Sequence, residues 1–166
     1  MSYEIGSLNE KDVEETVKLL QSLGSPASSI FSNSEMLKRT LYGPHVITLV
    51  GKEKEKIVGV INGTATTSPN ILLLATKPGE SLGSVLLDKF VDRVKNQFPS
   101  AKAVMTSLPA DMTEVVAFYS SKGFAVEGFV KSGLQGRDLV FLRKPLLPIP
   151  RHSDMNAGKK EKAAYI

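Results

Sequence analysis

The sequence predicts an α/β domain of the α+β type, in which a mixed central sheet of about six to seven strands is flanked by about four helices. Residues 46–50 and 57–61 are β-branched apolar runs joined by a short charged turn, which is typical of an antiparallel hairpin. Residues 71–75 are another apolar run, followed by a loop of small residues and a long amphipathic helix. Because a helix that links neighbouring strands makes them parallel, the sheet is expected to be mixed.

The length of 166 residues is that of one domain. From Pro145 onward the chain carries prolines and lysines and has no periodic apolar face. We therefore expect residues 1–146 to form the domain and residues 147–166 to form a flexible C-terminal tail.

The first elements are a short strand and two helices. Residues 3–5 alternate as in a strand, and Asn9 then precedes apolar residues at helical spacing that end at Gly24. Residues 25–34 are rich in Ser, Pro and Asn and predict a loop, whereas residues 35–42 predict a short second helix. A loop between two helices is a natural place for substrate contacts.

The second half of the chain predicts two further strand and helix units. Residues 101–106 are a strand after the long helix, and Asp111 with Glu114 resembles a capping arrangement for a last helix that ends at Gly123. A closing hairpin then follows, with strands at 124–131 and 138–143.

The segment from Lys77 to Leu87 joins a strand to a helix through small residues, and it predicts an anion site. The first turn of a helix leaves backbone N–H groups without intrahelical partners and carries the positive end of the helix dipole. Phosphate oxygens placed there gain several hydrogen-bond donors at once. A phosphate-bearing cofactor is therefore the first expectation.

Composition excludes several other classes of function. The chain has no cysteine, which excludes disulfides, thiolate metal sites and a cysteine nucleophile, and no His/Asp/Glu spacing proposes a metal. A formal net charge of +4 without a nucleic-acid-binding motif predicts no nucleic-acid partner. No apolar run is long enough to cross a bilayer, so we expect no membrane partner and a cytoplasmic protein.

Three segments carry a family resemblance. Residues 78–83 align without gaps on the loop pattern Arg/Gln-x-x-Gly-x-Gly/Ala, and Ser84-Val85-Leu86-Leu87 follows as Ser-x-Leu-Leu. Residues 115–124 match a helix that ends in an aromatic residue, Tyr, polar residues and Gly-Phe, and residues 56–60 match a strand with a central glycine. With the order of elements over residues 3–146, these segments resemble the GNAT superfamily of acetyl-CoA-dependent N-acetyltransferases.

The resemblance implies direct transfer of an acyl group, with acetyl-CoA as donor and coenzyme A as product, to an amine of unknown identity. It implies that Tyr119 is the general acid that protonates the departing thiolate, and it suggests a possible homodimer. It further implies that the cofactor binds at Leu73, Leu74, Ala75, Gly79, Glu80, Ser81, Leu82, Gly83, Ser84 and Tyr119.

The chain also departs from the family pattern. Pro78 stands where a basic or glutamine residue is usual, Ser81 replaces a glycine, and Met112 replaces an asparagine that contacts the cofactor arm. Glu80 adds a negative charge near the expected pyrophosphate, which Lys77 can offset in part.

No general base is visible in residues 71–75, where many relatives hold a glutamate. His45 is one candidate, although a histidine at the start of a strand is more often a surface residue. Glu127 could face the cleft from the closing strands but is equally well explained as a solvated strand residue. His152 lies in the expected tail and is expected to be inert. The alternative hypothesis is therefore a catalytically weak GNAT-like module that binds acyl-CoA or a protein partner as a sensor or scaffold.

Overall fold

The computed structural model describes residues 2–23, 33–78 and 81–147. It contains seven strands, four α-helices and one 3-10 helix. In chain order these are β1 (Glu4–Ser7), the 3-10 helix η1 (Glu10–Asp12), α1 (Val13–Leu23), α2 (Ser34–Leu41), β2 (Val46–Glu53), β3 (Lys56–Thr64), β4 (Asn70–Thr76), α3 (Leu82–Gln97), β5 (Ala103–Pro109), α4 (Thr113–Ser121), β6 (Ala125–Leu134) and β7 (Arg137–Pro145).

The strands form one mixed sheet in the order β1-β2-β3-β4-β5-β7-β6. All neighbouring strands are antiparallel except β4 and β5, which are parallel and are connected through α3. The predicted fold class is confirmed. The tail predicted from residue 147 lies almost wholly outside the described residues.

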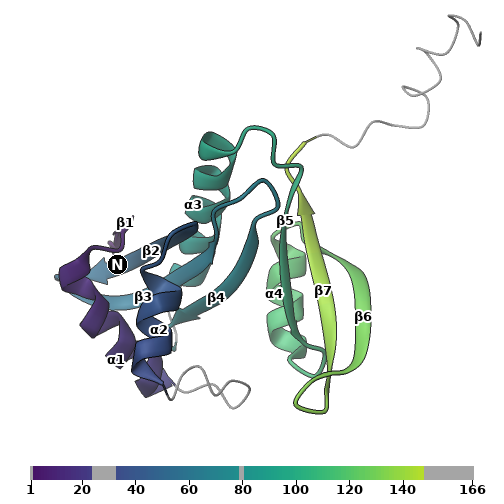
Figure 1. The fold of residues 1–166 in the computed structure, drawn as a ribbon, viewed down its shortest axis with the longest axis horizontal. Coiled ribbons are helices and arrows are strands. Elements are labelled where there is room, and N and C mark those ends of the chain that lie inside the picture. The colour runs from purple at the N-terminus through teal and green to yellow at the C-terminus, as the bar shows by residue number, and fades with distance from the viewer. Residues whose placement is uncertain (1, 24–32, 79–80, 148–166) are drawn as a thin grey trace, which may run out of the picture.

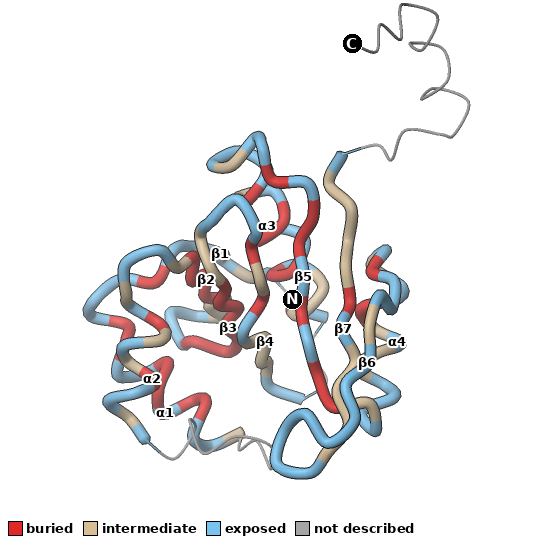
Figure 2. The backbone as a smooth tube through the Cα atoms, turned by 45° about the vertical axis from the view of Figure 1, so that its right-hand side comes forward, coloured by how far each residue is buried: buried red, intermediate tan, exposed pale blue. Residues whose placement is uncertain are grey.

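The helices cover the two faces of the sheet separately (Figure 1). Apolar residues of α1 and α2 pack with one set of sheet residues, including Val50 and Val60. Those of α3 and α4 pack with the other set, including Ile61 and Leu142. Figure 2 shows the buried segments gathered in β2, β3 and α3, whereas β6, at the edge of the sheet, is largely exposed. The sheet therefore separates two apolar cores.

A β-bulge in β4 marks the place where the sheet divides. Asn62 of β3 faces Leu73, but its neighbour Gly63 faces Ile71, so Leu72 is an extra residue without a partner on β3. Such an insertion bends a strand and increases its twist. Pairing between β4 and β5 is limited to two positions, of which the second is Ile71 with Thr106. Beyond it the two strands diverge (Figure 1).

The start of α3 is held against the sheet by a leucine seated over two glycines. Gly51 and Gly59 are partners on β2 and β3, and the fully buried side chain of Leu82 lies above them. A Cβ atom on either glycine would come within 2.7 Å of a Leu82 methyl carbon. The two glycines thus let the first turn of α3 approach the sheet closely.

Both helix starts for which a capping residue was predicted differ in detail. Asn9 precedes the 3-10 helix, but its side chain makes no capping bond and instead donates to the Asp12 carboxylate at 3.4 Å. The capping role predicted for Asp111 is wrong, because Met112 occupies the N-cap of α4 and Asp111 pairs with Arg137 instead. At α2, Asn33 caps the helix by accepting a bond from the Met36 N–H at 3.0 Å.

Asp12 ties the N-terminal helices to the sheet. This residue is 7% exposed, and its carboxylate accepts a hydrogen bond from the Lys52 ammonium of β2 at 2.9 Å. The bond and the charge of Lys52 lower the pKa of Asp12 against the opposing effect of burial. A carboxyl with a lowered pKa in the folded state stabilises the fold above its unfolded pKa, and this contribution is lost as the pH falls.

We predict that Asp12→Asn lowers the free energy of unfolding at pH 7 by about 1 kcal/mol. The difference from the wild type should shrink as the pH falls below about 4, where the wild-type carboxylate is protonated as well. Urea unfolding from pH 3 to 7 measures both effects. Glu14→Gln is the matched control, because Glu14 also pairs with a lysine but its side chain is 65% exposed. An equal loss in the two variants would contradict the role of Asp12.

Candidate functional site

A cavity of about 480 Å³ lies beside the divided edge of β4, between that strand, the start of α3 and α4. It brings together five of the residues predicted to bind the cofactor or act on it, namely Leu74, Ser81, Gly83, Ser84 and Tyr119. Its lining is completed by Thr76, Glu114, Val115 and Phe118.

The other predicted residues are placed differently. Leu73 and Ala75 direct their side chains to the core under α1 and α2, and the Leu82 side chain is buried beneath α3. These three residues can therefore face a ligand through their backbone alone. Gly79 and Glu80 lie outside the described residues.

The first turn of α3 supplies unpaired backbone donors at the cavity. The Ser84 N–H bonds the Ser81 carbonyl at 3.2 Å, whereas the N–H groups of Leu82 and Gly83 precede the first acceptor that an α-helix provides. Ser81 has a φ of −72°, so the serine at this position needs no left-handed backbone. A Cβ on Gly83 would meet Thr76 at 3.8 Å, which leaves the surface of this turn open.

The backbone of β4 offers a second row of hydrogen-bonding groups. The N–H of Lys77 donates to a β3 carbonyl at 2.9 Å, so Lys77 belongs to a hydrogen-bonded pair of the β3–β4 ladder. Because bonded and non-bonded pairs alternate in an antiparallel ladder, Leu73 and Ala75 turn their backbone groups toward β3. Leu74 and Thr76 turn theirs to the opposite side, from which β5 has diverged. An extended ligand with amide groups can pair there as a strand would.

Tyr119 lies at the inner end of the cavity with its ring in an aromatic cluster. The ring packs edge-on against Phe118 and Phe124, with centroids 5.4 and 5.1 Å away. Burial raises the pKa of Tyr119 to about 12, and the side chain of Thr106 acts in the opposite direction. The phenol is therefore protonated at neutral pH and can serve as a proton donor.

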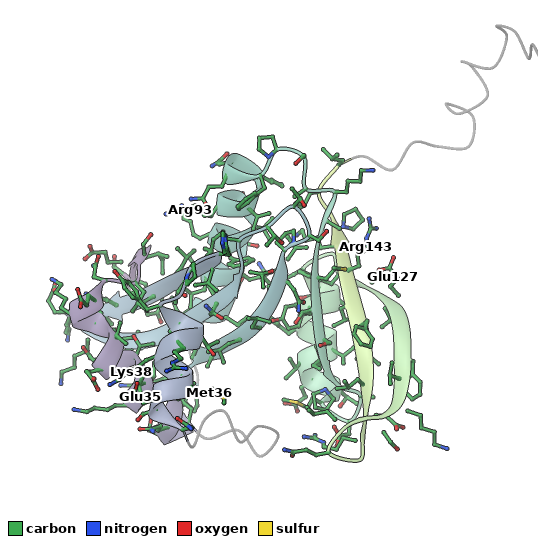
Figure 3. All side chains as sticks on the ribbon, in the orientation of Figure 1. Glu35, Met36, Lys38, Arg93, Glu127 and Arg143 are labelled. Carbon is green, nitrogen blue, oxygen red and sulfur yellow. The ribbon has the colours of Figure 1, made fainter. Side chains whose placement is uncertain are left out.

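The candidate bases are not brought to this cavity. The Glu127 carboxylate, whose side chain is 58% exposed, lies 3.7 Å from the Arg143 guanidinium on the β6–β7 hairpin, where Figure 3 shows the two side chains. His45 is exposed at the start of β2, and His152 lies outside the described residues. Glu114 is the carboxylate in the lining of the cavity, and its side chain is exposed at the rim.

Sequence reasoning missed four residues of this site. Glu114 and Val115 lie four residues before Phe118 and Tyr119 respectively, and this helical spacing could have identified them. Thr76 lies two residues after Leu74 on the same face of β4, which strand alternation could have indicated.

A different cavity, of about 380 Å³, lies near the other end of α3 and is lined by Ser7, Thr48, Arg93 and Gln97 among others. Figure 3 labels Arg93 on α3. This cavity has one cation but no helix N-terminus, so it lacks the array of backbone donors found at Gly83.

Within residues 2–23, 33–78 and 81–147, no cluster of three or more His, Asp or Glu side chains is arranged to hold a metal ion. None of the helices in these ranges is both long and apolar enough to cross a membrane.

No protein-family model matches the chain, and no curated protein matches its sequence. Solved structures match it closely in fold. The ribosomal-protein-S18-alanine N-acetyltransferase from Escherichia coli is 15% identical, with a TM-score of 0.75 over 91% of this chain and 98% of that one. A GNAT-family acetyltransferase from Streptococcus pneumoniae is 20% identical, with a TM-score of 0.73 over 87% and 99% of the two chains.

Ard1 from Thermoplasma volcanium is 21% identical, with a TM-score of 0.71 over 89% of this chain and 100% of that one. These similarities extend over nearly the whole of each matched structure. The chain therefore has the fold of the GNAT acetyltransferases, as its sequence predicted.

Proposed function

We propose that the protein is an acyl-CoA-dependent N-acyltransferase that uses acetyl-CoA and transfers its acetyl group directly to an amine. One observation carries the proposal: a single cavity joins a helix N-terminus, the open backbone edge of a strand and a buried, protonated tyrosine. These are the groups needed to hold a diphosphate, to align an amide-bearing arm and to protonate a leaving group.

The residues at the cavity fit this donor. The N–H groups of Leu82 and Gly83 face an anion with the positive end of the α3 dipole behind them. The open edge of β4 at Leu74 and Thr76 can pair with the amides of the pantetheine arm. Bound in this way, the donor presents a thioester, which supplies an acyl group on a thiolate leaving group.

Tyr119 completes the reaction by moving one proton. The amine nitrogen forms the new C–N bond, the C–S bond breaks, and the Tyr119 Oη–H gives its proton to the departing sulfur. The nitrogen releases its own proton, and the phenol is restored from solvent. The phenol is protonated at neutral pH, so its proton is in place when the C–S bond breaks.

The amine has no dedicated base among the described residues of the cavity. Glu114 is exposed at the rim. We propose that the amine reaches its neutral form by losing a proton to water. The same observation favours the second candidate function, an acyl-CoA-binding module without turnover.

Calorimetric titration with acetyl-CoA, followed by a turnover assay, separates the two candidates. The chain contains no cysteine, so a thiol reagent detects released coenzyme A without any background from the protein. The assay uses a panel of spermidine, lysine amide and a short peptide with a free amino end. Binding with thiol release supports the enzyme, binding without release supports the module, and the absence of binding contradicts both.

We predict that Tyr119→Phe lowers kcat about 100-fold and leaves the Kd for acetyl-CoA unchanged. The phenylalanine keeps the ring in the aromatic cluster and removes the proton donor alone. Calorimetry and the thiol-release assay measure the two quantities. A weakened Kd with unchanged kcat would show that Tyr119 binds the donor and does not protonate it.

We predict that Gly83→Asp weakens acetyl-CoA binding at least about tenfold, which corresponds to about 1.4 kcal/mol. The carboxylate would occupy the anion position at the helix N-terminus. An acidic residue in the first turn favours the helix, so the loss of binding should come without a loss of stability. Gly6→Asp is the charge-matched control, because a Cβ at Gly6 meets nothing within 4 Å. Equal affinities of the two variants would contradict the proposed anion site.

We predict that kcat/KM rises about tenfold per pH unit toward the pKa of an alkylamine acceptor, about 10.4. Deprotonation of Tyr119 would lower kcat/KM at high pH. We expect no such decrease below about pH 10, since the Tyr119 pKa is about 12. Initial rates from pH 6 to 10 test both statements. A plateau beginning near pH 7 would indicate a protein base and contradict the transfer of the amine proton to water.

A further inference from the structure

The cavity of about 380 Å³ beside Arg93 lies where the edge of β2 passes the end of β1, and we call it the Arg93 cavity. In its lining, Ile47 belongs to the core under α3, whereas Leu41 belongs to the core under α1 and α2. The cavity therefore reaches both faces of the sheet around the edge of β2. Its volume is at the lower end of the range for small-molecule sites, about 300–1,000 Å³, so it suits a small ligand.

The edge of β2 presents backbone groups to this cavity. β1 pairs with β2 from Leu49 onward, and the Leu8 N–H then donates to the Thr48 carbonyl at 3.0 Å before the chain turns into η1. Val46 is two residues from Thr48, so its N–H and carbonyl turn to the same side, past the end of β1. The His45 carbonyl accepts a bond from the opposite side at 2.7 Å, which agrees with this alternation. An amide-bearing ligand can pair with Val46 as a further strand would.

Arg93 of α3 supplies a positive charge at the same cavity. Its guanidinium donates to the Ser7 hydroxyl at 3.4 Å, a longer distance than the 2.7–3.2 Å usual for such a bond. Within the part of the chain that the structure describes, no carboxylate forms an ion pair with Arg93. Asp92 and Lys89 lie around a smaller cavity next to it, and their charges offset each other. Most of the five guanidinium N–H donors are thus available to a carboxylate, whose geometry they match.

Two neutral side chains add donors beside the guanidinium. The Ser7 hydroxyl accepts the bond from Arg93 and keeps its own proton to donate. Gln97 also lines the cavity, and it lies four residues after Arg93, on the same face of α3. A guanidinium, a hydroxyl and a carboxamide from two elements can therefore bind one carboxylate together.

The C-terminal end of α2 borders the cavity as well, and its partial negative charge opposes an anion. Its last carbonyls are already bonded: the Leu41 carbonyl accepts from the Thr48 hydroxyl at 2.6 Å, and the Thr40 carbonyl accepts from the Asn62 amide at 3.0 Å. These bonds reduce the repulsion, and the full charge of Arg93 outweighs the remainder.

We propose that the Arg93 cavity binds a carboxylate that one carbon separates from an amide, as in an N-acyl amino acid or the C-terminal residue of a peptide. Arg93 holds the carboxylate, and the amide pairs with Val46 at the edge of β2. The buried side chains of Leu8 and Ile47 offer the ligand an apolar contact. Arg93 lies about 15 Å along α3 from Gly83, so this site is separate from the cavity at Tyr119 and does not depend on the acyltransferase function.

The first test titrates the full ¹⁵N-labelled chain with N-acetyl-leucine, which has the carboxylate, the amide and an apolar side chain. The NMR signals of the Val46, Thr48 and Gln97 backbone amides should move with a Kd of about 1 mM. The Gly83 signal, at the other cavity, should stay in place. Exchange of the Val46 amide proton with solvent should slow about fivefold or more at saturation, because the ligand bonds to it. No movement up to about 20 mM probe, or movement around Gly83 alone, would overturn the proposal.

The second test removes one group of the probe at a time. N-acetyl-leucine amide lacks the carboxylate, and 4-methylpentanoate lacks the amide, so each should bind at least about tenfold more weakly than N-acetyl-leucine. Equal binding of the first compound would overturn the carboxylate site, and equal binding of the second would overturn the pairing with β2. A tetrapeptide of three glycines and a C-terminal leucine distinguishes the sources: its binding assigns the site to peptide ends, and its exclusion assigns the site to free N-acyl amino acids.

The third test changes the protein. Arg93→Gln should weaken the binding of N-acetyl-leucine at least about tenfold. Lys95→Gln is the matched control, because it removes the same charge from an exposed position of α3 outside the cavity, and its Kd should equal that of the wild type. Arg93→Lys keeps the charge without the planar fork, so it should also bind more weakly, and it serves as the test if the glutamine variant does not fold. Wild-type affinity in either Arg93 variant would overturn the site.

Discussion

The early end of pairing between β4 and β5 is the constraint on which the rest of the structure depends. Two paired positions hold the sheet together, and the bulge at Leu72 then turns β4 away from its neighbour. Backbone groups that an unbroken sheet would have used in its own ladder remain available at Leu74 and Thr76. The loss of internal hydrogen bonds is thus localised to one strand edge, and that edge borders the cavity that α3 and α4 complete.

The fold was predictable because its elements are encoded by local patterns. Alternating or continuous apolar runs specified the strands, and the loop of small residues before Leu82 specified the start of α3. Gly83 and Tyr119, which line the cavity, lie on such patterns and could be named from the sequence. Helix ends were less predictable, since the choice at Asp111 depended on Arg137, a partner 26 residues away.

The structural features that the sequence could not reveal depend on the register of strand pairing and on contacts between distant elements. The bulge is one extra residue in an otherwise regular apolar run, and nothing in residues 71–75 distinguishes Leu72 from its neighbours. The Thr106 hydroxyl donates to the Ile71 carbonyl of β4 at 3.2 Å, and a lone threonine in an apolar strand gives no local signal of such a partner. The direction in which β4 presents its backbone likewise follows from its pairing with β3.

The separation of the two apolar cores by the sheet has a consequence for how such a molecule can vary. The core under α1 and α2 shares no buried side chain with the core that supports α3, α4 and the cavity. Substitutions that reshape the first core can therefore accumulate while the second remains intact. This arrangement allows the two faces of the sheet to diverge in sequence independently of each other.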